Sequence, residues 1–452
     1  MHPFIAKRVV FDLQERIKGK NTNTVLKELE KSQWLSANRI QEIQFEQLTR
    51  HLEFAYRHVP YYRCLFDEHD IQPNRIKDLN DFRRIPFLTR ESLRDQFENL
   101  RSQVSIRGVQ KLSTGGSTGS PVSVLVDPIR NSFVDAVRLR SHRWFDADVG
   151  VREVVLWGSP IEVTRQDYVR NIRDRLMNSR LLSAFNLGES SLAKYSDVIV
   201  SYQPVKMYGY ASALYLLAQY FQKNNREPPH TLKVIFATAE PLFDFQRRTI
   251  EVAFGTKVAI EYGARDAGLM ANECPEGGLH IPAEGMLIEV ERSGSEAAGE
   301  IVVTNLYSQA MPIIRYRTGD IGELADGPCP CGRGLPLLRS VQGRQTDFIL
   351  TADGRIIHAL AVIYVLRDCP EIEKFQVVQQ SASEITVIIV PRAVLRESVR
   401  TKIHANLQKL LGTNTQITIT TAPTISTSPS GKFRYVISKV AASHLSISEA
   451  SA

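Results

Sequence analysis

The sequence predicts an α/β protein with a large N-terminal domain of mixed β-sheets and helices and a small α+β C-terminal domain. Between residues 100 and 345, apolar segments of strand length alternate with segments of helical spacing, which is typical of an α/β sheet. After residue 346 the pattern changes to short strands and helices. A chain of 452 residues also exceeds one ordinary hydrophobic core, so we expect at least two domains.

The first 100 residues are expected to be mainly helical. Apolar residues recur at helical spacing in residues 24–29 and 43–48, as on the buried face of a helix. Residues that favour helix starts, Asn80-Asp81 and Thr89, stand shortly before apolar positions.

The α/β part offers four candidate strands and two candidate helices. The strands are residues 154–157, 206–210, 234–237 and 258–260, and the helices are residues 212–222 and 243–254. In sheets of this kind, ligands bind where the strands end in loops. We therefore examine the residues that follow each candidate strand.

Composition and charge exclude several classes of protein. Charged residues interrupt the apolar positions of residues 1–20, unlike the apolar region of a signal peptide. No apolar run reaches the roughly 18 to 20 residues of a transmembrane segment. The net charge of +7 is modest for this length, and no nucleic-acid-binding module is recognisable. We expect a cytoplasmic protein without nucleic acid as a partner.

The densest basic segment, residues 165–175, carries acidic residues among its arginines. A solvated helix face is the simplest interpretation, and an anionic ligand or a membrane surface is the alternative.

Residues 113–121 consist of Ser, Thr, Gly and Pro and precede a segment, residues 122–126, that alternates as a strand does. This composition lets backbone N–H groups and hydroxyls converge on phosphate oxygens. The segment does not match the P-loop pattern, because Gly119 is followed by Ser120 and Pro121. On its own it is also consistent with a turn or linker.

Three carboxylates follow strand-like segments. Glu240 lies in the turn Ala239-Glu240-Pro241, Asp266 follows Tyr262-Gly263, and Asp320 lies in residues 314–321. Such a carboxylate can accept the hydroxyls of a ribose or hold Mg²⁺ against phosphates. The alternative for each is a helix cap or a turn.

Three cysteines and one histidine lie on two segments rich in Pro and Gly: Cys274, His280, Cys329 and Cys331. Five cysteines in all are too few, and odd in number, for a disulfide framework. Four N/S ligands in tight turns suit a closed tetrahedral Zn²⁺ site. The spacing is not that of two CxxC knuckles, so an accidental grouping remains an alternative.

The order of these motifs resembles that of adenylate-forming enzymes, the superfamily of acyl-CoA synthetases and peptide-synthetase adenylation domains. The resemblance covers about the last three quarters of the chain. Residues 60–63 and 85–90 resemble segments of the phenylacetate-CoA ligase-like branch, some of whose members belong to surface-polysaccharide pathways. The motifs that carry the resemblance to the superfamily are residues 113–121, Tyr262-Gly263 with Asp266, 316–320, Gly343-Arg344 with Asp347, and 430–432.

The resemblance implies a role for each residue of these motifs. Tyr262 and Gly263 would bind adenine beside Ala239, Glu240 and Pro241. Asp320 and Arg344 would bind the ribose. Asp266 would hold Mg²⁺ in place of the usual Glu, and Lys432 would stabilise charge as the acid attacks the α-phosphate. The phosphate loop would comprise Ser113, Thr114, Gly115, Gly116, Ser117, Thr118 and Gly119.

The resemblance also implies a mobile C-terminal domain and a structural zinc. The C-terminal domain would rotate on a hinge near Thr346, first delivering Lys432 and then opening a path for the acyl acceptor. The zinc would clamp the Asp266 loop to the segment after Asp320. The expected limits are residues 1–345 for the N-terminal domain, 346–442 for the C-terminal domain and 443–452 for a polar, disordered tail.

Two segments depart from the branch. Residues 156–160 and the following Arg-rich run replace an aromatic, Gly-rich segment of the acyl pocket, and residues 353–358 differ from the usual G-x-N-x-x-P segment. Phenylacetate itself is therefore not the expected substrate. The carboxylic acid stays open, as does the oligomeric state, for which a homodimer is one alternative.

The leading hypothesis is ATP-dependent formation of an acyl-adenylate, followed by transfer to CoA. A second hypothesis keeps the adenylate and transfers the acyl group to an amine or hydroxyl of a sugar or carrier. A third, of another class, is a non-catalytic, zinc-stabilised nucleotide-binding module.

Overall fold

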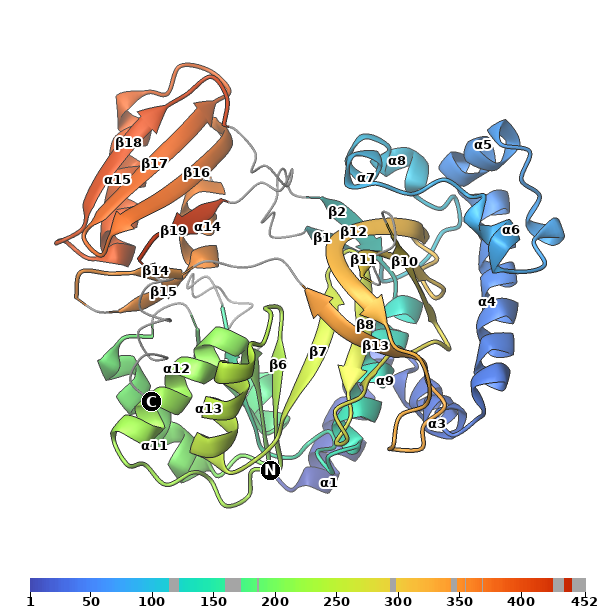
Figure 1. The fold of residues 1–452 in the computed structure, drawn as a ribbon, viewed down its shortest axis with the longest axis horizontal. Helices are drawn as coiled ribbons and strands as arrows, with labels where there is room; N and C mark the ends of the chain where they lie inside the picture. Colours follow the sequence, from blue (N-terminus) through green and yellow to red (C-terminus); the bar gives the residue numbers. More distant parts are fainter. Residues whose placement is uncertain are drawn as a thin grey trace.

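The computed structural model describes residues 1–113, 122–158, 172–184, 187–292, 298–342, 348–353, 355–367, 369–425 and 435–440 (Figure 1). The N-terminal helices flank a large central sheet, and a second, smaller sheet lies at the other side of the molecule (Figure 1). Among the described residues, no helix is long and apolar enough to cross a membrane.

The N-terminal region is helical, as predicted. Its elements are α1 (Pro3–Ile5), η1 (Ala6–Phe11), α2 (Asp12–Ile17), α3 (Thr22–Ser32), α4 (Ala37–His58), α5 (Pro60–Glu68), η2 (Pro73–Arg75), α6 (Leu79–Arg83), α7 (Arg90–Asp95) and α8 (Phe97–Leu100). Thr89 caps α7 as expected, because its hydroxyl accepts a hydrogen bond from the Ser92 N–H at 3.1 Å. The predicted start at Asn80-Asp81 is two residues late, because the Asp78 carboxylate caps α6 by accepting both of their N–H groups.

One eleven-stranded sheet forms the centre of the large body, in the order β10-β11-β12-β13-β9-β8-β7-β6-β5-β3-β4. Strands β4, β3, β5, β6 and β7 are parallel, and the remaining pairs are antiparallel. The strands are β3 (Glu153–Trp157), β4 (Ser179–Ser183), β5 (Lys206–Tyr210), β6 (Val234–Thr238), β7 (Val258–Ala264), β8 (Gly268–Glu273), β9 (Leu279–His280), β10 (Met286–Glu291), β11 (Gly299–Asn305), β12 (Ile313–Leu324) and β13 (Leu337–Gln342).

The parallel part has the predicted alternation of strands and helices. The four predicted strands correspond to β3, β5, β6 and β7, and the two predicted helices correspond to α12 and α13. The helices are α9 (Pro128–Arg143), α11 (Glu189–Tyr202), α12 (Ala211–Lys223) and α13 (Asp244–Phe254). The carboxyl ends of these parallel strands therefore lie at one edge of the sheet, where ligand sites are expected.

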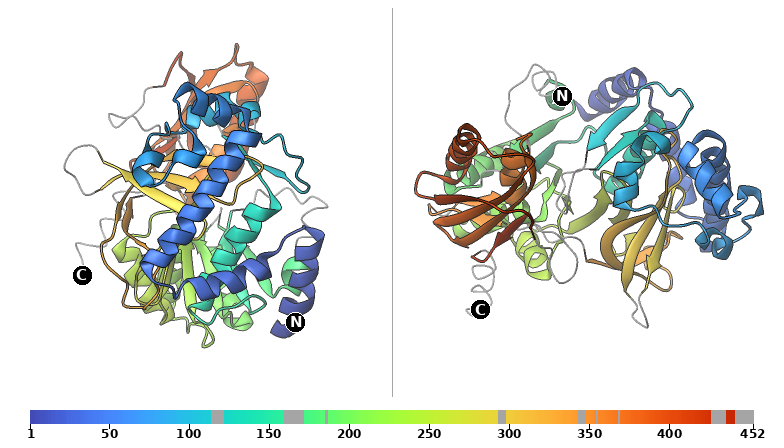
Figure 2. Two further views of the ribbon diagram at one scale, coloured as in Figure 1. Left: turned by 90° about the vertical axis from the view of Figure 1, so that its right-hand side faces the viewer. Right: turned by 90° about the horizontal axis from the view of Figure 1, so that it is seen from above.

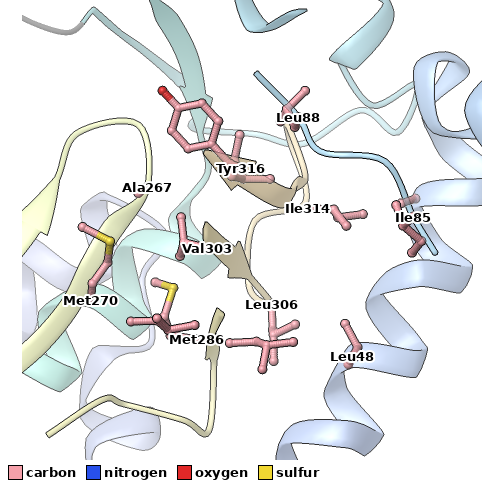
Figure 3. Packing of buried hydrophobic residues seen from close by; sticks show 14 of the residues in the cluster. Leu48, Ile85, Leu88, Ala267, Met270, Met286, Val303, Leu306, Ile314 and Tyr316 are labelled. Carbon is pink, nitrogen blue, oxygen red and sulfur yellow. The ribbon is translucent and has the colours of Figure 1, made fainter. Parts of the chain in front are cut away.

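A hydrophobic core joins the N-terminal helices to the antiparallel strands (Figure 3). Leu48 of α4 and Ile85 lie across from Ile314 and Leu306 in this core (Figure 3). Buried Tyr62 adds a polar link, because its hydroxyl donates to the Pro312 carbonyl at 3.0 Å and accepts from the Ile314 N–H at 3.2 Å. These hydrogen bonds hold α5 beside β12.

Backbone contacts of Leu88 place residues 85–90 next to the candidate site. Leu88 pairs with Tyr316 as an isolated parallel bridge. The Leu88 N–H donates to the Arg315 carbonyl at 2.9 Å, and the Leu88 carbonyl accepts from the Arg317 N–H at 3.0 Å. Figure 3 shows the Tyr316 ring beside Leu88.

The C-terminal part has its own sheet and its own hydrophobic core, as the sequence predicts. The sheet order is β18-β17-β16-β19, and β14 pairs with β15. The elements are β14 (Phe348–Leu350), β15 (Ile356–His358), α14 (Ala359–Arg367), β16 (Ile372–Ser381), β17 (Glu384–Pro391), α15 (Glu397–Leu411), β18 (Gln416–Thr421) and β19 (Val436–Ser438). The domain limits stay predictions, since residues 343–347 and 441–452 lie outside the described residues.

Candidate functional site

The candidate site lies where β6 and β7 end and β12 passes beside them. Tyr262 of β7 donates its phenolic hydrogen bond to the Asp320 carboxylate of β12 at 3.0 Å. The two residues are 58 positions apart, and β7 and β12 are not neighbours in the sheet. The structure thus brings together the residues expected at the adenine and at the ribose.

Asp266 is held rigidly in the turn between β7 and β8. Its side chain is buried, and its two oxygens accept hydrogen bonds from the Tyr316 hydroxyl at 2.8 Å and from the Ala267 N–H at 3.1 Å. The Arg90 guanidinium lies 4.0 Å from the same carboxylate. The residue expected to hold Mg²⁺ is therefore already part of a polar cluster.

Arg130 supports this turn from the first helix after the phosphate loop. Its Nη2 donates to the carbonyls of Arg265 at 3.0 Å and Asp266 at 2.9 Å. Burial lowers the pKa of Arg130 to about 10, with Asp266 and Asp127 acting in the opposite direction. Sequence patterns do not reveal this role, because arginine on a helix usually faces solvent.

Ser113, the first residue of the expected phosphate loop, is anchored by strands and by Arg265. β1 (Gln110–Ser113) and β2 (Ser123–Val126) form an antiparallel pair in which Ser113 lies opposite Ser123. Their hydroxyls are 3.1 Å apart, and Arg265 Nη1 donates to the Ser113 carbonyl at 3.1 Å. The strand predicted at residues 122–126 is confirmed as β2, and Ser113 is tied to the turn that contains Asp266.

The turn Ala239-Glu240-Pro241 follows β6. Ala239 has φ of 65°, a left-handed conformation that costs a residue with a Cβ on the order of 1 kcal/mol. The Glu240 carboxylate accepts a hydrogen bond from the Ser212 N–H at 3.0 Å, in the first turn of α12. This contact fixes the turn to the end of β5.

Other predicted site residues lie outside the described residues. They are Thr114, Gly115, Gly116, Ser117, Thr118 and Gly119 of the phosphate loop, Arg344 and Lys432.

A buried polar network lies behind Tyr262, and the sequence did not reveal it. Glu261 accepts hydrogen bonds from His142 at 3.1 Å and Arg138 at 3.2 Å, and Lys206 Nζ lies 2.9 Å from His142 Nδ1. Burial raises the pKa of Glu261, but Arg138 and His142 outweigh it and bring that pKa to about 2. Burial and then Lys206 lower the pKa of His142 to about 4. The imidazole is therefore neutral, and the network holds β7 at the residue before Tyr262.

The four predicted zinc ligands meet in space. One ligand atom from each of Cys274, His280, Cys329 and Cys331 lies within 4.8 Å of the others. Cys274 and His280 come from the β8–β9 hairpin, and the other two cysteines come from the connection between β12 and β13. His280 Nδ1 lies 3.4 Å from the Leu335 carbonyl and Nε2 lies 3.2 Å from Cys331 Sγ. The Nε2 atom thus faces the thiols, as a zinc-binding imidazole would.

Comparison with known proteins places these features in a wider context. Residues 349–439 match the family described as CapK C-terminal domain. The chain is 24% identical to Protein CapK of Staphylococcus aureus over 417 residues, which cover 89% of this chain and 90% of that protein. It is 27% identical to phenylacetate-coenzyme A ligase of Thermus thermophilus over 350 residues, 75% of this chain and 77% of that protein.

Solved structures show the same fold. A structure of 2-hydroxyisobutyryl-CoA ligase, in complex with 2-HIB-AMP and CoA in the thioesterification state, has a TM-score of 0.61 and 21% identity. The match covers 93% of this chain and 94% of that one.

Proposed function

We infer that this chain is an AMP-forming ligase of the adenylate-forming superfamily, and we propose that it activates a carboxylic acid with ATP and passes the acyl group to CoA. In the first step a carboxylate oxygen bonds to the α-phosphorus, and pyrophosphate leaves with the electron pair of the broken P–O bond. In the second step the CoA thiolate attacks the acyl carbon, and AMP leaves.

The observation that carries this proposal is the hydrogen bond between Tyr262 and Asp320. The bond orients the Asp320 carboxylate at the edge of the Tyr262 ring. A fixed carboxylate next to an aromatic ring suits a nucleoside, because the ring can stack on the base while the carboxylate accepts hydroxyl hydrogens of the sugar. We assign adenine to Tyr262, beside the Glu240 turn, and the ribose to Asp320.

Asp266 fits one position in the coordination of Mg²⁺. Each of its oxygens accepts one protein hydrogen bond, and a carboxylate offers about four lone-pair positions. Mg²⁺ usually takes one or two carboxylates together with phosphate oxygens and waters. We propose that Asp266 binds Mg²⁺ through one oxygen while Tyr316 and Ala267 keep the carboxylate in place. The ion would neutralise charge on the triphosphate.

The four-residue Cys/His cluster fits a structural Zn²⁺ ion. Three thiols and one imidazole fill a tetrahedral coordination sphere and leave no position for substrate. The cluster joins the β8–β9 hairpin to the β12–β13 connection. β8 pairs with β7, which carries Tyr262, and β12 carries Asp320. We propose that the metal stabilises the relative position of β8 and β12.

A second candidate changes the acceptor rather than the activation step. The acyl group would pass to an amine or hydroxyl of a sugar or carrier in surface-polysaccharide biosynthesis. The match of residues 349–439 to the CapK C-terminal domain favours it, because the C-terminal domain is the part expected to receive the acceptor. Residues 353–358 depart from the usual CoA-ligase segment, which points in the same direction.

One screen separates these proposals. Pyrophosphate release is measured with ATP, Mg²⁺ and a library of carboxylic acids, and each active acid is then tested for product with CoA and with amino sugars. Pyrophosphate release followed by a CoA thioester supports the first candidate, and an amide or ester without a thioester supports the second. If ATP binds and no acid releases pyrophosphate, the result contradicts both candidates and supports the non-catalytic nucleotide-binding module.

A further inference from the structure

An exposed apolar stripe runs along the N-terminal helical segment, residues 3–17. Four large side chains form it at intervals of four or five residues, and all are exposed: Phe4, Val9, Leu13 and Ile17. The interval of five spans the π-helical stretch η1, whose wider turn keeps Phe4 and Val9 on one side of the helix. The opposite side is buried through Ala6, Phe11 and Glu15. The segment is therefore docked on the protein by one side and presents apolar residues to solvent on the other.

A second element extends this surface. The helical residues 172–176 carry exposed Ile172 and Leu176. They lie beside the N-terminal segment, because Met177 packs in the same cluster as Phe11 and the Asn178 amide donates to the Met1 carbonyl at 2.9 Å. Figure 2 shows the N-terminal helix at the edge of the molecule. We call this surface the N-terminal face; it comprises Phe4, Ile5, Val9, Leu13, Ile17, Ile172 and Leu176.

Basic side chains surround the N-terminal face. Arg8, Arg16 and Lys18 are exposed on the helix itself, and Arg175 and Arg180 line an adjacent hollow of about 380 Å³. Residues 1–20 are all described and contain two acidic side chains. Glu15 is buried against Lys20 at 3.1 Å, and Asp12 accepts a hydrogen bond from the Asn23 amide at 2.7 Å.

Part of the positive charge is paired: Lys7 with Asp148 at 2.6 Å, Lys20 with Glu15 at 3.1 Å and with Asp135, and Arg173 with Asp174 at 2.5 Å. Burial, then Lys20 and Arg173, lower the pKa of Lys18, and the nearby carboxylates Asp135 and Glu15 do not reverse that shift. Among the described residues, exposed Arg8, Arg16 and Lys18 form no salt bridge, so a positive potential extends from this side of the protein and would attract anions.

An apolar stripe bordered by Lys and Arg is the pattern of a helix that lies in the interface of an anionic lipid bilayer. A second copy of the chain fits less well, because a two-fold contact would bring the same basic residues of both copies face to face. We propose that the N-terminal face docks the protein on a membrane surface that contains anionic lipid, with the apolar side chains inserted among the headgroups.

Cosedimentation with vesicles tests the proposal. The probes are vesicles of phosphatidylcholine alone and of phosphatidylcholine with phosphatidylserine. The wild-type chain should bind the anionic vesicles more tightly, and added salt should weaken that binding. L13Q/I17Q should weaken binding tenfold or more, because two apolar side chains no longer insert favourably. R8Q/R16Q should weaken it roughly 25-fold, at about fivefold per basic residue.

The matched controls lie on α13. Val252 is 75% exposed and Ile17 is 77% exposed, so V252Q removes an apolar side chain of similar exposure from another face of the protein. R248Q removes an exposed arginine from α13. Both controls should bind vesicles as the wild type does. All four variants should keep the wild-type melting temperature and rate of pyrophosphate release, so failure here is distinguishable from failure of the proposed chemistry.

Two results would overturn the proposal. One is a wild-type chain that does not sediment with anionic vesicles, or controls that lose binding as much as L13Q/I17Q does. The other is a dimer in analytical ultracentrifugation that the substitutions L13Q/I17Q dissociate, together with no lipid binding by the wild type or any variant. That result would make the N-terminal face a contact between two copies of the chain.

Discussion

At the scale of single residues, we propose that nucleotide recognition depends most on Asp320. Its carboxylate is oriented by the Tyr262 hydroxyl, so the acceptor that we assign to two ribose hydroxyls would be in place before ATP binds. Preorganisation of this kind reduces the entropy lost on binding. The two residues should therefore contribute unequally to the affinity for ATP. Asp320 would contact the sugar, whereas the Tyr262 hydroxyl would orient the Asp320 carboxylate.

We predict that D320A weakens ATP binding by about 2 to 3 kcal/mol, the usual contribution of hydrogen bonds to a charged group. Y262F removes the orienting hydroxyl and keeps the ring, so it should weaken ATP binding by about 1 kcal/mol. Isothermal titration calorimetry with ATP and Mg²⁺ measures both. Equal affinities for wild type and D320A would remove the ribose assignment.

His51 makes the fold sensitive to acid. Its ring is buried on α4, and its Nε2 has no hydrogen-bond partner among the described residues. Burial lowers its pKa to about 4, so the unfolded chain, in which histidine has a pKa near 6.5, binds the proton more readily. The free energy of unfolding therefore rises with pH between about 4 and 6.5, and the stability is lost as the pH falls through that range.

We predict that H51L flattens this dependence by an amount on the order of 2 to 3 kcal/mol between pH 7 and pH 4. The matched control is H69Q, because His69 is exposed at the end of α5. Urea unfolding of the three proteins across that pH range gives the comparison. A pH dependence in H51L as steep as in the wild type would show that other groups cause it.

At the scale of secondary structure, the parallel strands could be predicted and the helix α9 could not. Strands β3, β5, β6 and β7 are apolar runs bounded by turns, a signal that burial on both faces produces. α9 carries buried Arg130 and Arg140, and Arg140 is buried because it pairs with Glu284 at 2.5 Å and donates to the Leu29 carbonyl at 3.1 Å. Hydrophobic periodicity does not detect a core made of such pairs.

The site shows the same division. Motif order indicated that Tyr262, Asp266 and Asp320 act together, and the structure places them around one turn. The supporting contacts of Arg90 and Arg130 depend on residues about 135 to 180 positions away in sequence. No local pattern contains that information, because it arises only when α7, α9 and the β7–β8 turn pack against one another.

The two hairpins around the Cys/His cluster should depend on a metal for their stability. We predict one zinc per chain in protein purified without chelator, as measured by elemental analysis. C331S should lower the melting temperature because a structural site contributes folding free energy, and it should change the rate of pyrophosphate release little in the fraction that stays folded. C64S is the control, because Cys64 is exposed on α5. Absence of zinc from the wild type would contradict the assignment.

At the scale of the whole molecule, two separate cores allow the C-terminal domain to act as a unit. The cluster that contains Val377, Ile389 and Leu407 is composed of residues from 349 to 436 alone, so the domain can rotate without exposing the core of the large sheet. Rotation on a hinge near Thr346 would deliver Lys432 for one step and remove it for the next. The reaction itself can therefore test the motion.

We predict that K432A abolishes adenylate formation and leaves acyl transfer from a preformed adenylate intact. Removing a lysine that we expect at the surface should change stability by no more than about 0.5 kcal/mol. Losing its charge beside the α-phosphate should cost about 3 kcal/mol of transition-state stabilisation, on the order of a hundredfold in rate.

The control is K439A, since Lys439 is exposed seven residues away, directly after β19. Both half-reactions of K439A should proceed at the wild-type rate. Pyrophosphate exchange reports the first half-reaction, and thioester formation from synthetic acyl-adenylate reports the second. Equal loss in both would mean that Lys432 stays in the site throughout, and the C-terminal domain would not then exchange between two positions during the cycle.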